Sequence, residues 1–254
     1  MSSKLQAMKK GGKVLSEAMA SAINSAKPGV KLPQIEDIFC QQLKKNSVEA
    51  SFKKVANYSW ATCINIDNGV VHGIPEGKSI SKGDLLSIDG GVFCDGFHTD
   101  MAYSFIVGKP LSEVYKNSFL HSGRKALDQA LKATRSGGRV GSISKAIQDQ
   151  VESDGLYCVE TLTGHGVGKN LHQEPYIPCV LTKDIKDTPK ISDGESLAIE
   201  IIYTDTVPNL KTEADGWTIV NKGGRISGLF EKSVFVTGSS LVDLTPYFWE
   251  ENAR

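Results

Sequence analysis

The sequence predicts an α+β fold in which helices cover an antiparallel sheet. Amphipathic helical segments begin the chain and return in its middle, and short β-rich runs follow each group of helices. Groups of helices and groups of strands, in place of strict alternation, are typical of α+β proteins. No linker rich in Pro or Ser divides the 254 residues. We therefore expect one domain that spans residues 1–254.

The helices are predicted from the spacing of apolar residues. From Val14 to Ala26 these residues recur at helical intervals, and Lys27-Pro28-Gly29 ends the pattern. A second amphipathic helix is expected over residues 33–45. Later helices are expected over residues 111–133 and 143–154.

The strands are predicted from short β-rich runs between Gly, Pro and Asp turns. Asp95-Gly96 joins two of these runs, and this dipeptide between apolar runs is a strong signal for a β-hairpin. The predicted strands cover residues 62–66, 85–89, 99–107, 196–203, 217–220 and 229–236.

The charge balance argues against a polyanionic partner. The chain has 29 Lys and Arg residues against 29 Asp and Glu residues, whereas nucleic-acid-binding proteins normally carry a basic face. We therefore expect neither direct nucleic-acid binding nor a membrane-surface role. The N-terminal segment lacks the apolar core of a signal peptide, and no run reaches the roughly 18 apolar residues of a membrane span. These observations predict a cytoplasmic protein.

The cysteines indicate neither disulfides nor a structural metal. A chain of this length can bury enough surface to hold a core without such cross-links. The five cysteines have no CxxC spacing, so they are interpreted as reduced thiols and not as a zinc site. They are Cys40, Cys63, Cys94, Cys158 and Cys179.

Two aspartates flank the predicted hairpin turn. Asp89 and Asp100 are nearly symmetric about Asp95-Gly96, so their carboxylates can approach each other across an antiparallel pair. Carboxylates this close repel one another unless a cation lies between them. Aspartates near turns are common, so this pair alone is weak support for a metal site.

One imidazole and two further carboxylates extend this set. His165 lies in the glycine-rich stretch 163–168, where the flanking glycines leave its side chain uncrowded; a single histidine is nevertheless more often a structural residue. Glu200 lies in a run that is apolar on both sides, so its carboxylate must be protonated, paired or metal-bound. Glu231 lies in another β-rich run, where a solvated strand position is the alternative.

Together, these residues have the composition of a hydrolytic two-metal centre. Four carboxylates and one imidazole supply more oxygen than nitrogen and no sulfur, a set that suits Mn, Fe, Co or Zn. His72 lies next to a turn and is a candidate to serve the substrate, not the metal. His98 and His121 are interpreted as structural or surface residues.

The order of these motifs resembles that of the methionine aminopeptidases, specifically the short bacterial type I form of the pita-bread metallopeptidase superfamily. The resemblance covers nearly the whole chain. His165 and Glu200 are 35 residues apart and Glu200 and Glu231 are 31 apart, which leaves no room for the long insertion of the type II enzymes. The matching motifs are Val71-His72-Gly73-Ile74-Pro75, Ile88-Asp89 with Asp100, Gly164-His165-Gly166-Val167-Gly168, the stretch from His172 to Pro175, Ile199-Glu200, Asp215-Gly216-Trp217-Thr218 and Phe230-Glu231.

This resemblance implies a pita-bread (creatinase/aminopeptidase-like) fold, in which helices cover a curved antiparallel sheet, and a centre with two divalent metal ions (Mn, Fe, Co or Zn). The implied ligands are Asp89, Asp100, His165, Glu200 and Glu231, with Asp100 and Glu231 bridging the ions and Asp89 chelating one of them. A hydroxide between the ions attacks the first peptide bond in this family, and the resemblance implies that Glu200 moves its proton.

The resemblance also implies the substrate and its contacts. His172 is expected to hydrogen-bond the scissile carbonyl, and His72 is expected to contact the scissile amide nitrogen. Tyr58 and Trp217 are expected to line the methionine pocket, which Phe52 and Val55 reshape. The implied activity removes N-terminal methionine from nascent proteins whose second residue is small. The resemblance further implies a cytoplasmic monomer that acts on peptide or nascent-chain N-termini close to the ribosome.

Two residues depart from the family pattern. Relatives usually carry Pro after the Glu200 position and His after the Glu231 position, whereas this chain has Ile201 and Lys232. Lys232 is expected to place a cation close to a bridging ligand.

Two alternative functions remain open. An Xaa-Pro aminopeptidase or prolidase uses the same metal set, but its members normally carry an extra N-terminal domain, and Asp215-Gly216-Trp217 is more typical of the methionine enzymes. A non-catalytic binding protein on the same fold is expected to have lost ligands, whereas all five are present here. Metal content distinguishes the binding protein from both enzymes, and cleavage of Ala-Pro against Met-Ala peptides distinguishes the two enzymes.

Overall fold

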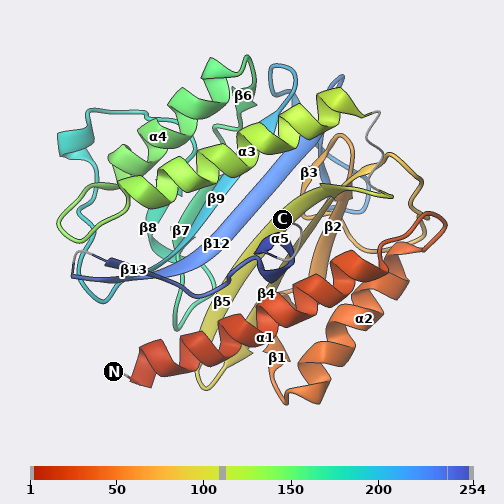
Figure 1. Cartoon of the computed structure of the whole chain (residues 1–254), viewed down its shortest axis with the longest axis horizontal. Coiled ribbons are helices and arrows are strands. Elements are labelled where there is room, and N and C mark those ends of the chain that lie inside the picture. Colours follow the sequence, from red (N-terminus) through yellow and green to blue (C-terminus); the bar gives the residue numbers. More distant parts are fainter. Residues whose placement is uncertain (1–2, 109–112, 239, 252–254) are drawn as a thin grey trace.

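A twisted antiparallel sheet forms the centre of the molecule, and helices cover one of its faces (Figure 1). The structure, a computed structural model, describes residues 3–108, 113–238 and 240–251. Within these ranges, the large sheet has ten strands, and all of its pairings are antiparallel. They are β1 (Glu49–Ala50), β2 (Thr62–Ile66), β4 (Leu85–Cys94), β5 (Phe97–Ile106), β6 (Tyr157–Cys158), β7 (Thr163–Gly166), β8 (Gln173–Pro178), β9 (Ser196–Thr204), β12 (Ser227–Thr237) and β13 (Ser240–Asp243).

The order of the long strands differs from their order in the chain. The main path of the sheet is β1-β4-β5-β12-β9-β7-β8, so β12 lies between strands from the two halves of the sequence. Elsewhere in the described chain, a smaller sheet joins β10 (Leu210–Thr212), β11 (Ile219–Asn221) and β3 (Gly69–Val71). Its strands carry residues close to the predicted site.

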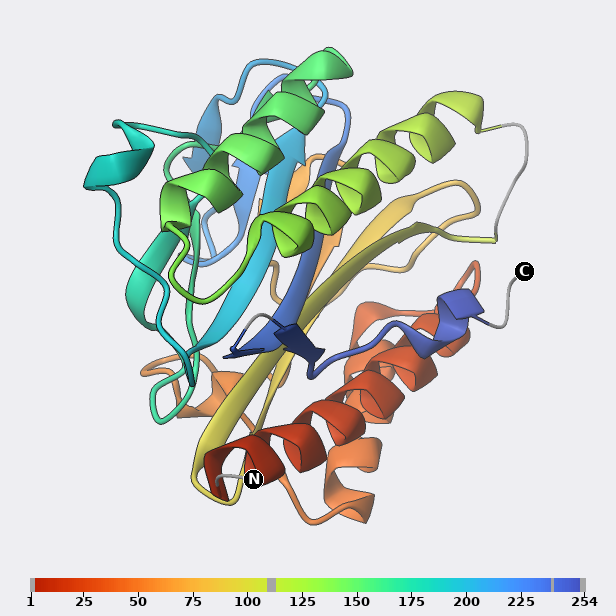
Figure 2. The same ribbon diagram turned by 60° about the vertical axis from the view of Figure 1, so that its left-hand side comes forward.

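The helices pack as two pairs against the large sheet. The first pair is α1 (Ser3–Ser25) and α2 (Leu32–Lys45), and the second is α3 (Val114–Ala133) and α4 (Val140–Ser153). Figure 2 shows both pairs on one side of the strands, with the short C-terminal helix α5 (Phe248–Glu251) beside α1. Short 3-10 turns occur at Phe52–Lys54 and Ile185–Asp187. The predicted α+β class, with helices covering an antiparallel sheet, is confirmed.

The first helix is longer than predicted. It begins at Ser3 and not at Val14, and it continues through Gly11 and Gly12. Each glycine weakens a helix by about 1 kcal/mol relative to Ala. For this reason the sequence pattern did not predict the N-terminal part of the helix. Packing explains their presence, because a Cβ at Gly12 would overlap the backbone oxygen of Leu244 at 2.0 Å.

Other boundaries also differ from the predictions. The second helix pair begins at Val114 and Val140 in the described chain; residues 111 and 112 of the predicted helix lie outside the described residues. The strand predicted over 217–220 is Ile219–Asn221. The hairpin is confirmed, since Asp95 and Gly96 form a two-residue turn with φ values of +49° and +88°.

No helix in the described ranges is long and apolar enough to cross a membrane.

The glycine pair in the middle of β4 marks a close approach on both faces of the sheet. A Cβ at Gly90 would come within 2.7 Å of the Phe39 ring of α2. A Cβ at Gly91 would come within 2.7 Å of Ser51, on the opposite face. The sheet is therefore tightly packed against α2 on one side and against the segment that follows β1 on the other.

The contact between α3 and β9 gives a test of the packing. A Cβ at Gly123 would lie 2.4 Å from the hydroxyl of Tyr203, a fully buried side chain that stacks on Phe119 and donates a hydrogen bond to its backbone oxygen (2.8 Å). Higher helix propensity would stabilise Gly123→Ala by about 1 kcal/mol. Overpacking costs about 1–3 kcal/mol, and the displaced hydroxyl loses its partner at a similar cost.

We therefore expect Gly123→Ala to lower the free energy of unfolding by about 1–3 kcal/mol, measured by urea denaturation. In a Tyr203→Leu background, the same change is expected to have a smaller effect or to be stabilising. An equal loss in both backgrounds would contradict the proposed steric origin.

Candidate active site

The register of the sheet places three of the predicted carboxylates in one row across four strands. Asp89 in β4 pairs with Ala102 in β5, Ala102 pairs with Glu231 in β12, and Glu231 pairs with Glu200 in β9. Directly paired residues point to the same face of a sheet. The three acidic side chains therefore share one face, and Ala102 leaves space between them.

The other two predicted ligands lie in the adjacent row on the same face. Asp100 in β5 pairs with Gly91, and His165 in β7 pairs with Ala198 in β9. Ser233 in β12 lies between them: its hydroxyl accepts a hydrogen bond from the Asp100 amide (2.9 Å) and donates one to the Asp100 carbonyl (2.8 Å). The residues opposite the ligands are small, which leaves the face open above the acidic groups.

Asp89 and Asp100 are diagonal neighbours and do not face each other directly. The two-residue turn pairs Cys94 with Phe97, so Asp89 falls opposite Ala102. Because side chains two residues apart lie on the same face of a strand, the two carboxylates still approach each other. Ligand oxygens of Asp89, Asp100 and Glu231 lie within 4.8 Å of one another.

Asp100 and Glu231 are buried and Asp89 and Glu200 half-buried, without a compensating cation in the described chain. Burial raises the pKa of Asp100 to about 7, and burial together with Asp100 raises the pKa of Glu200 to about 8. Burial and the neighbouring carboxylates also raise the pKa values of Asp89 and Glu231. Among the described residues, Oδ1 of Asp89 and Oδ1 of Asp100 have no hydrogen-bond partner.

His165 presents an unprotonated nitrogen to these carboxylates. Its Nδ1 lies 3.1 Å from the carbonyl oxygen of Gly166, a contact in which Nδ1 carries the proton. Burial is the largest influence on its pKa, which is lowered to about 4, so the imidazole is neutral at pH 7. Its Nε2 then faces Oδ2 of Asp100 at 3.9 Å and Oε1 of Glu231 at 3.8 Å. Groups that all accept hydrogen bonds converge here, which is unfavourable unless a cation lies between them.

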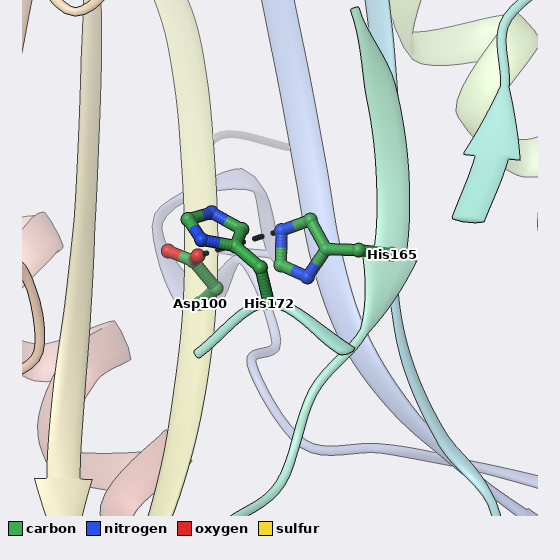
Figure 3. A group of neighbouring side chains, drawn as sticks. All are labelled: Asp100, His165 and His172. Atoms are coloured by element: carbon green, nitrogen blue, oxygen red, sulfur yellow. Dashed lines mark ion pairs between the residues drawn. The ribbon is translucent and has the colours of Figure 1, made fainter. Parts of the chain in front are cut away.

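The donor set fits divalent cations. Three overlapping groups each bring their ligand atoms within 4.8 Å of one another: Asp89, Asp100 and Glu231; His165, Glu200 and Glu231; and Asp100, His165 and His172. Figure 3 shows the last group converging from β5, from β7 and from the segment before β8. Carboxylate oxygens combined with one or two imidazoles suit first-row transition metals.

Two further imidazoles lie at the exposed edge of the cluster. The ring of His172 meets the ring of His165 edge-on, with centroids 4.4 Å apart. His72 follows β3 and has a left-handed backbone with φ of +58°, a conformation that costs an L-residue about 1–2 kcal/mol. Burial by neighbouring protein lowers the pKa values of both side chains, and His172 lowers that of His72 further.

An apolar cavity of about 170 Å³ adjoins the carboxylates. The rings of Phe52 and Trp217 contact Tyr58 edge-on, at centroid distances of 6.4 Å and 5.0 Å. Asp215 fixes the turn that presents Trp217, because its Oδ1 accepts the Trp217 amide (2.8 Å). All ten side chains predicted for the site line this one cavity: Phe52, Tyr58, His72, Asp89, Asp100, His165, His172, Glu200, Trp217 and Glu231.

Sequence reasoning did not single out three other side chains that line the cavity: Cys63, Val71 and Leu171. The Cys63 thiol lies 3.1 Å from the Tyr58 hydroxyl, and burial raises its pKa. Strand β2 is buried on both sides, so no polar alternation reveals which of its residues face the site. The pairing of Cys63 with Asp89 shows that Cys63 faces the site, but the register of β2 against β4 cannot be predicted from the sequence.

His98 and His121 lie outside the cluster. The Nδ1 atom of buried His98 is 2.8 Å from the Ser51 hydroxyl, which ties β5 to the start of the segment that carries Phe52. His121 lies on α3, which covers the opposite face of the sheet.

The prediction that Lys232 places a cation close to a bridging ligand is wrong. Lys232 follows Glu231 in β12, so its side chain points to the opposite face of the sheet. Its Nζ lies 2.7 Å from Oδ2 of Asp243 and 4.4 Å from the centre of the Tyr247 ring. Ile201 likewise follows Glu200 on the helix-covered face, where it is fully buried. Neither unusual residue points into the site.

A buried carboxylate cluster that fits divalent cations, beside an apolar cavity, is the arrangement expected of a metal-dependent hydrolase. A family model described as metallopeptidase family M24 matches residues 6–237. The chain belongs to this family, and membership of a metallopeptidase family, together with the carboxylate and imidazole groups, indicates a divalent-metal site.

The chain is similar to several methionine aminopeptidases over nearly its whole length. It is 33% identical over 249 residues to the methionine aminopeptidase of Aquifex aeolicus, with 95% of each chain covered. The crystal structure of the methionine aminopeptidase from Thermotoga maritima matches with a TM-score of 0.92 at 31% identity, covering 96% of this chain and 97% of that one. The prolidase from Pyrococcus furiosus matches at 20% identity with a TM-score of 0.76, covering 97% of this chain and 64% of that one. This last likeness concerns the fold alone. The predicted pita-bread fold is confirmed.

The carboxylate cluster predicts how stability depends on pH when metal is removed. The pKa of Asp100 rises from 3.8 to about 7, and that of Glu200 from 4.5 to about 8, so the folded chain holds protons that the unfolded chain has released. This stabilisation is complete below about pH 4 and is lost above about pH 8. In chelator, we expect the Tm to fall between about pH 4 and about pH 8, and excess Mn²⁺ to remove that slope.

Two variants test the origin of the slope. Glu200→Gln is expected to reduce it, whereas Glu160→Gln, at an exposed position, is expected to leave it unchanged. A Tm in chelator that does not depend on pH over this range would contradict the expectation.

Proposed function

We propose that this protein is a metal-dependent aminopeptidase that removes N-terminal methionine from proteins whose second residue is small. The observation that carries the proposal is the convergence of five carboxylate and imidazole side chains from five strands beside an apolar cavity. Similarity to methionine aminopeptidases over 95% of the chain supports the same conclusion. We further propose that residues 1–254 act as one catalytic domain.

We propose that the site holds two divalent ions, Mn, Fe, Co or Zn, with Asp89, Asp100, His165, Glu200 and Glu231 as ligands. Glu231 belongs both to the group with Asp89 and Asp100 and to the group with His165 and Glu200, which supports a bridging role for it. We also assign Asp100 as a bridging ligand. When bound, such ions lower the pKa of water and so supply a nucleophile at neutral pH.

The chain's own residues handle protons and charge around the scissile bond. We assign Glu200 to proton transfer, and its half-buried carboxyl, with the pKa raised to about 8, supports this role. We assign His172 to the scissile carbonyl oxygen and His72 to the scissile amide nitrogen. Their lowered pKa values keep both imidazoles neutral, so each retains one N–H to donate.

We assign the cavity to the side chain of the N-terminal methionine. The rings of Phe52, Tyr58 and Trp217 supply apolar walls, and thioethers make favourable contacts with aromatic rings. The Tyr58 hydroxyl does not serve the substrate in this assignment, because it donates to the carbonyl oxygen of Thr62 (2.9 Å). The pocket therefore offers ring surface, which suits an unbranched apolar side chain.

We propose that the substrates are peptide or nascent-chain N-termini and that the enzyme acts in the cytoplasm as a monomer close to the ribosome. The prolidase alternative is less favoured, because the likeness to a prolidase is limited to the fold. The non-catalytic alternative is less favoured because every proposed ligand is in place.

The first test is a peptide panel with Mn²⁺-loaded protein. We expect chelator-sensitive cleavage of Met-Ala-Ser, and little cleavage of Met-Leu-Ser or Ala-Pro-Ser. Cleavage of Ala-Pro-Ser alone would overturn the proposed substrate while retaining the metal centre. Bound metal without cleavage of any of these peptides would favour the non-catalytic alternative.

The second test replaces Glu200 with glutamine. Gln keeps the size of Glu but cannot carry a proton, so kcat is expected to fall by about 10²–10⁴-fold. The Tm in chelator at about pH 4, where the folded and unfolded chains both hold this proton, is expected to stay close to that of the unchanged protein. Cleavage at the wild-type rate would refute the proton-transfer role of Glu200.

A further inference from the structure

The backbone at His72 is held in an unfavourable conformation. His72 has φ of +58°, and Gly73 directly follows it. A non-glycine residue with positive φ persists only where its surroundings impose that geometry. The chain around His72 must therefore supply contacts that fix the turn.

Strand β2 supplies these contacts from two consecutive residues. The carboxamide Oδ1 of Asn65 accepts the Gly73 amide (3.1 Å), and the Ile64 amide donates to the Gly73 carbonyl (2.7 Å). The fit is close, because a Cβ at Gly73 would lie 2.6 Å from Asn65 Oδ1 and 2.4 Å from the Ile64 oxygen. Hydrogen bonds to β2 thus hold both the amide and the carbonyl of Gly73, the residue directly after His72. We call this pair of hydrogen bonds the clamp.

Asn65 lies next to the site without lining its cavity. In β2 it is two residues from Cys63, so both side chains point to the face of the sheet that carries the carboxylates. It is 3% exposed. The Asn65 side chain therefore connects the rigid sheet to the loop that carries His72.

We propose that Asn65 is a positioning residue for His72: its carboxamide oxygen, by binding the Gly73 amide, holds the left-handed turn that directs the imidazole toward the scissile bond. This inference rests on the proposed function. Asn65 acts through His72 and does not itself contact the substrate or the metal.

The hydrogen bonding of Asn65 distinguishes it from a purely structural asparagine. Its Nδ2 is buried and has no hydrogen-bond partner within the described ranges, an arrangement that is unfavourable for stability. Asn221, by contrast, is satisfied at both ends: its Oδ1 accepts the Asn209 amide (2.7 Å) and its Nδ2 donates to the Thr206 hydroxyl (3.1 Å). The hydrogen bond that Oδ1 of Asn65 accepts from the Gly73 amide is therefore the contact through which this side chain acts.

The test is a double-mutant cycle with Asn65→Leu and His72→Ala, measured on Met-Ala-Ser with Mn²⁺-loaded protein. Leu has the same branched skeleton as Asn, but two methyl groups replace its amide oxygen and nitrogen, so no acceptor remains. We expect Asn65→Leu to lower kcat by about 10-fold or more, with KM within about twofold and metal content unchanged. In the His72→Ala background, the same change is expected to cause no further loss. Losses that multiply would overturn the proposal.

Two controls separate positioning from general destabilisation. Asn65→Asp keeps an acceptor oxygen and is expected to retain most of the wild-type kcat. Asn221→Ala removes a buried asparagine of similar burial from outside the site and is expected to lower the Tm while leaving kcat unchanged. If Asn65→Leu does not fold, Asn65→Ala takes its place in the cycle. A loss of kcat in Asn65→Asp equal to that in Asn65→Leu would contradict the acceptor role.

A readout that needs no activity separates failure of this proposal from failure of the proposed function. Hydrogen exchange of the Gly73 amide, followed by NMR, is expected to accelerate at least about 10-fold in Asn65→Leu and to be unchanged in Asn221→Ala. If the protein cleaves no peptide but Asn65→Leu still accelerates Gly73 exchange, the peptidase assignment is refuted. The role of Asn65 in holding Gly73 is then retained. Unchanged Gly73 exchange would refute the clamp, whatever the peptide panel shows.

Discussion

The mutual repulsion of four buried or half-buried carboxylates is the constraint on which the site depends. Asp89, Asp100, Glu200 and Glu231 come from separate strands, and the register of the sheet fixes where each side chain lies. Like charges at this separation, in a buried environment, are unfavourable unless they are protonated or share a cation. The hydrogen bonds of the sheet hold the groups together against this repulsion. A divalent cation between these carboxylates would relieve the repulsion.

The two faces of the sheet have different roles: one carries the proposed ligands and the other packs against the helices. Alternation along each strand sends the ligands to one face and apolar residues such as Ile201 and Phe230 to the other, where the helices pack. The hydroxyl of Tyr247 reaches the backbone oxygens of both Ala102 and Glu231 at 2.8 Å, so the C-terminal segment braces β5 and β12 directly behind the carboxylates. Packing on the helix face therefore determines the spacing of charged groups on the open face.

The sequence was sufficient to predict the fold class, the hairpin at Asp95-Gly96 and ten of the side chains that line the cavity, because these depend on local signals or on motifs in a recognisable order. It was not sufficient where a feature depends on pairing between distant residues. The face to which Cys63 points follows from its register with Asp89, and the N-terminal half of α1 is masked by glycines that only the contact with Leu244 explains. The position of Lys232 was predicted wrongly because proximity along the chain was given more weight than strand alternation.

The position of β12 has a consequence for how the site comes into being during synthesis. A ribosome makes β4, β5, β7 and β9 before β12, yet β12 occupies the middle of the finished sheet and pairs Glu231 with both Ala102 and Glu200. Until that strand is released and inserted, the earlier strands lack both a shared neighbour and one of the four acids. Such long-range pairing is slow compared with local contacts. A chain that lacks β12 therefore has no assembled centre, and the complete set of four acids forms only after β12 has been made and inserted.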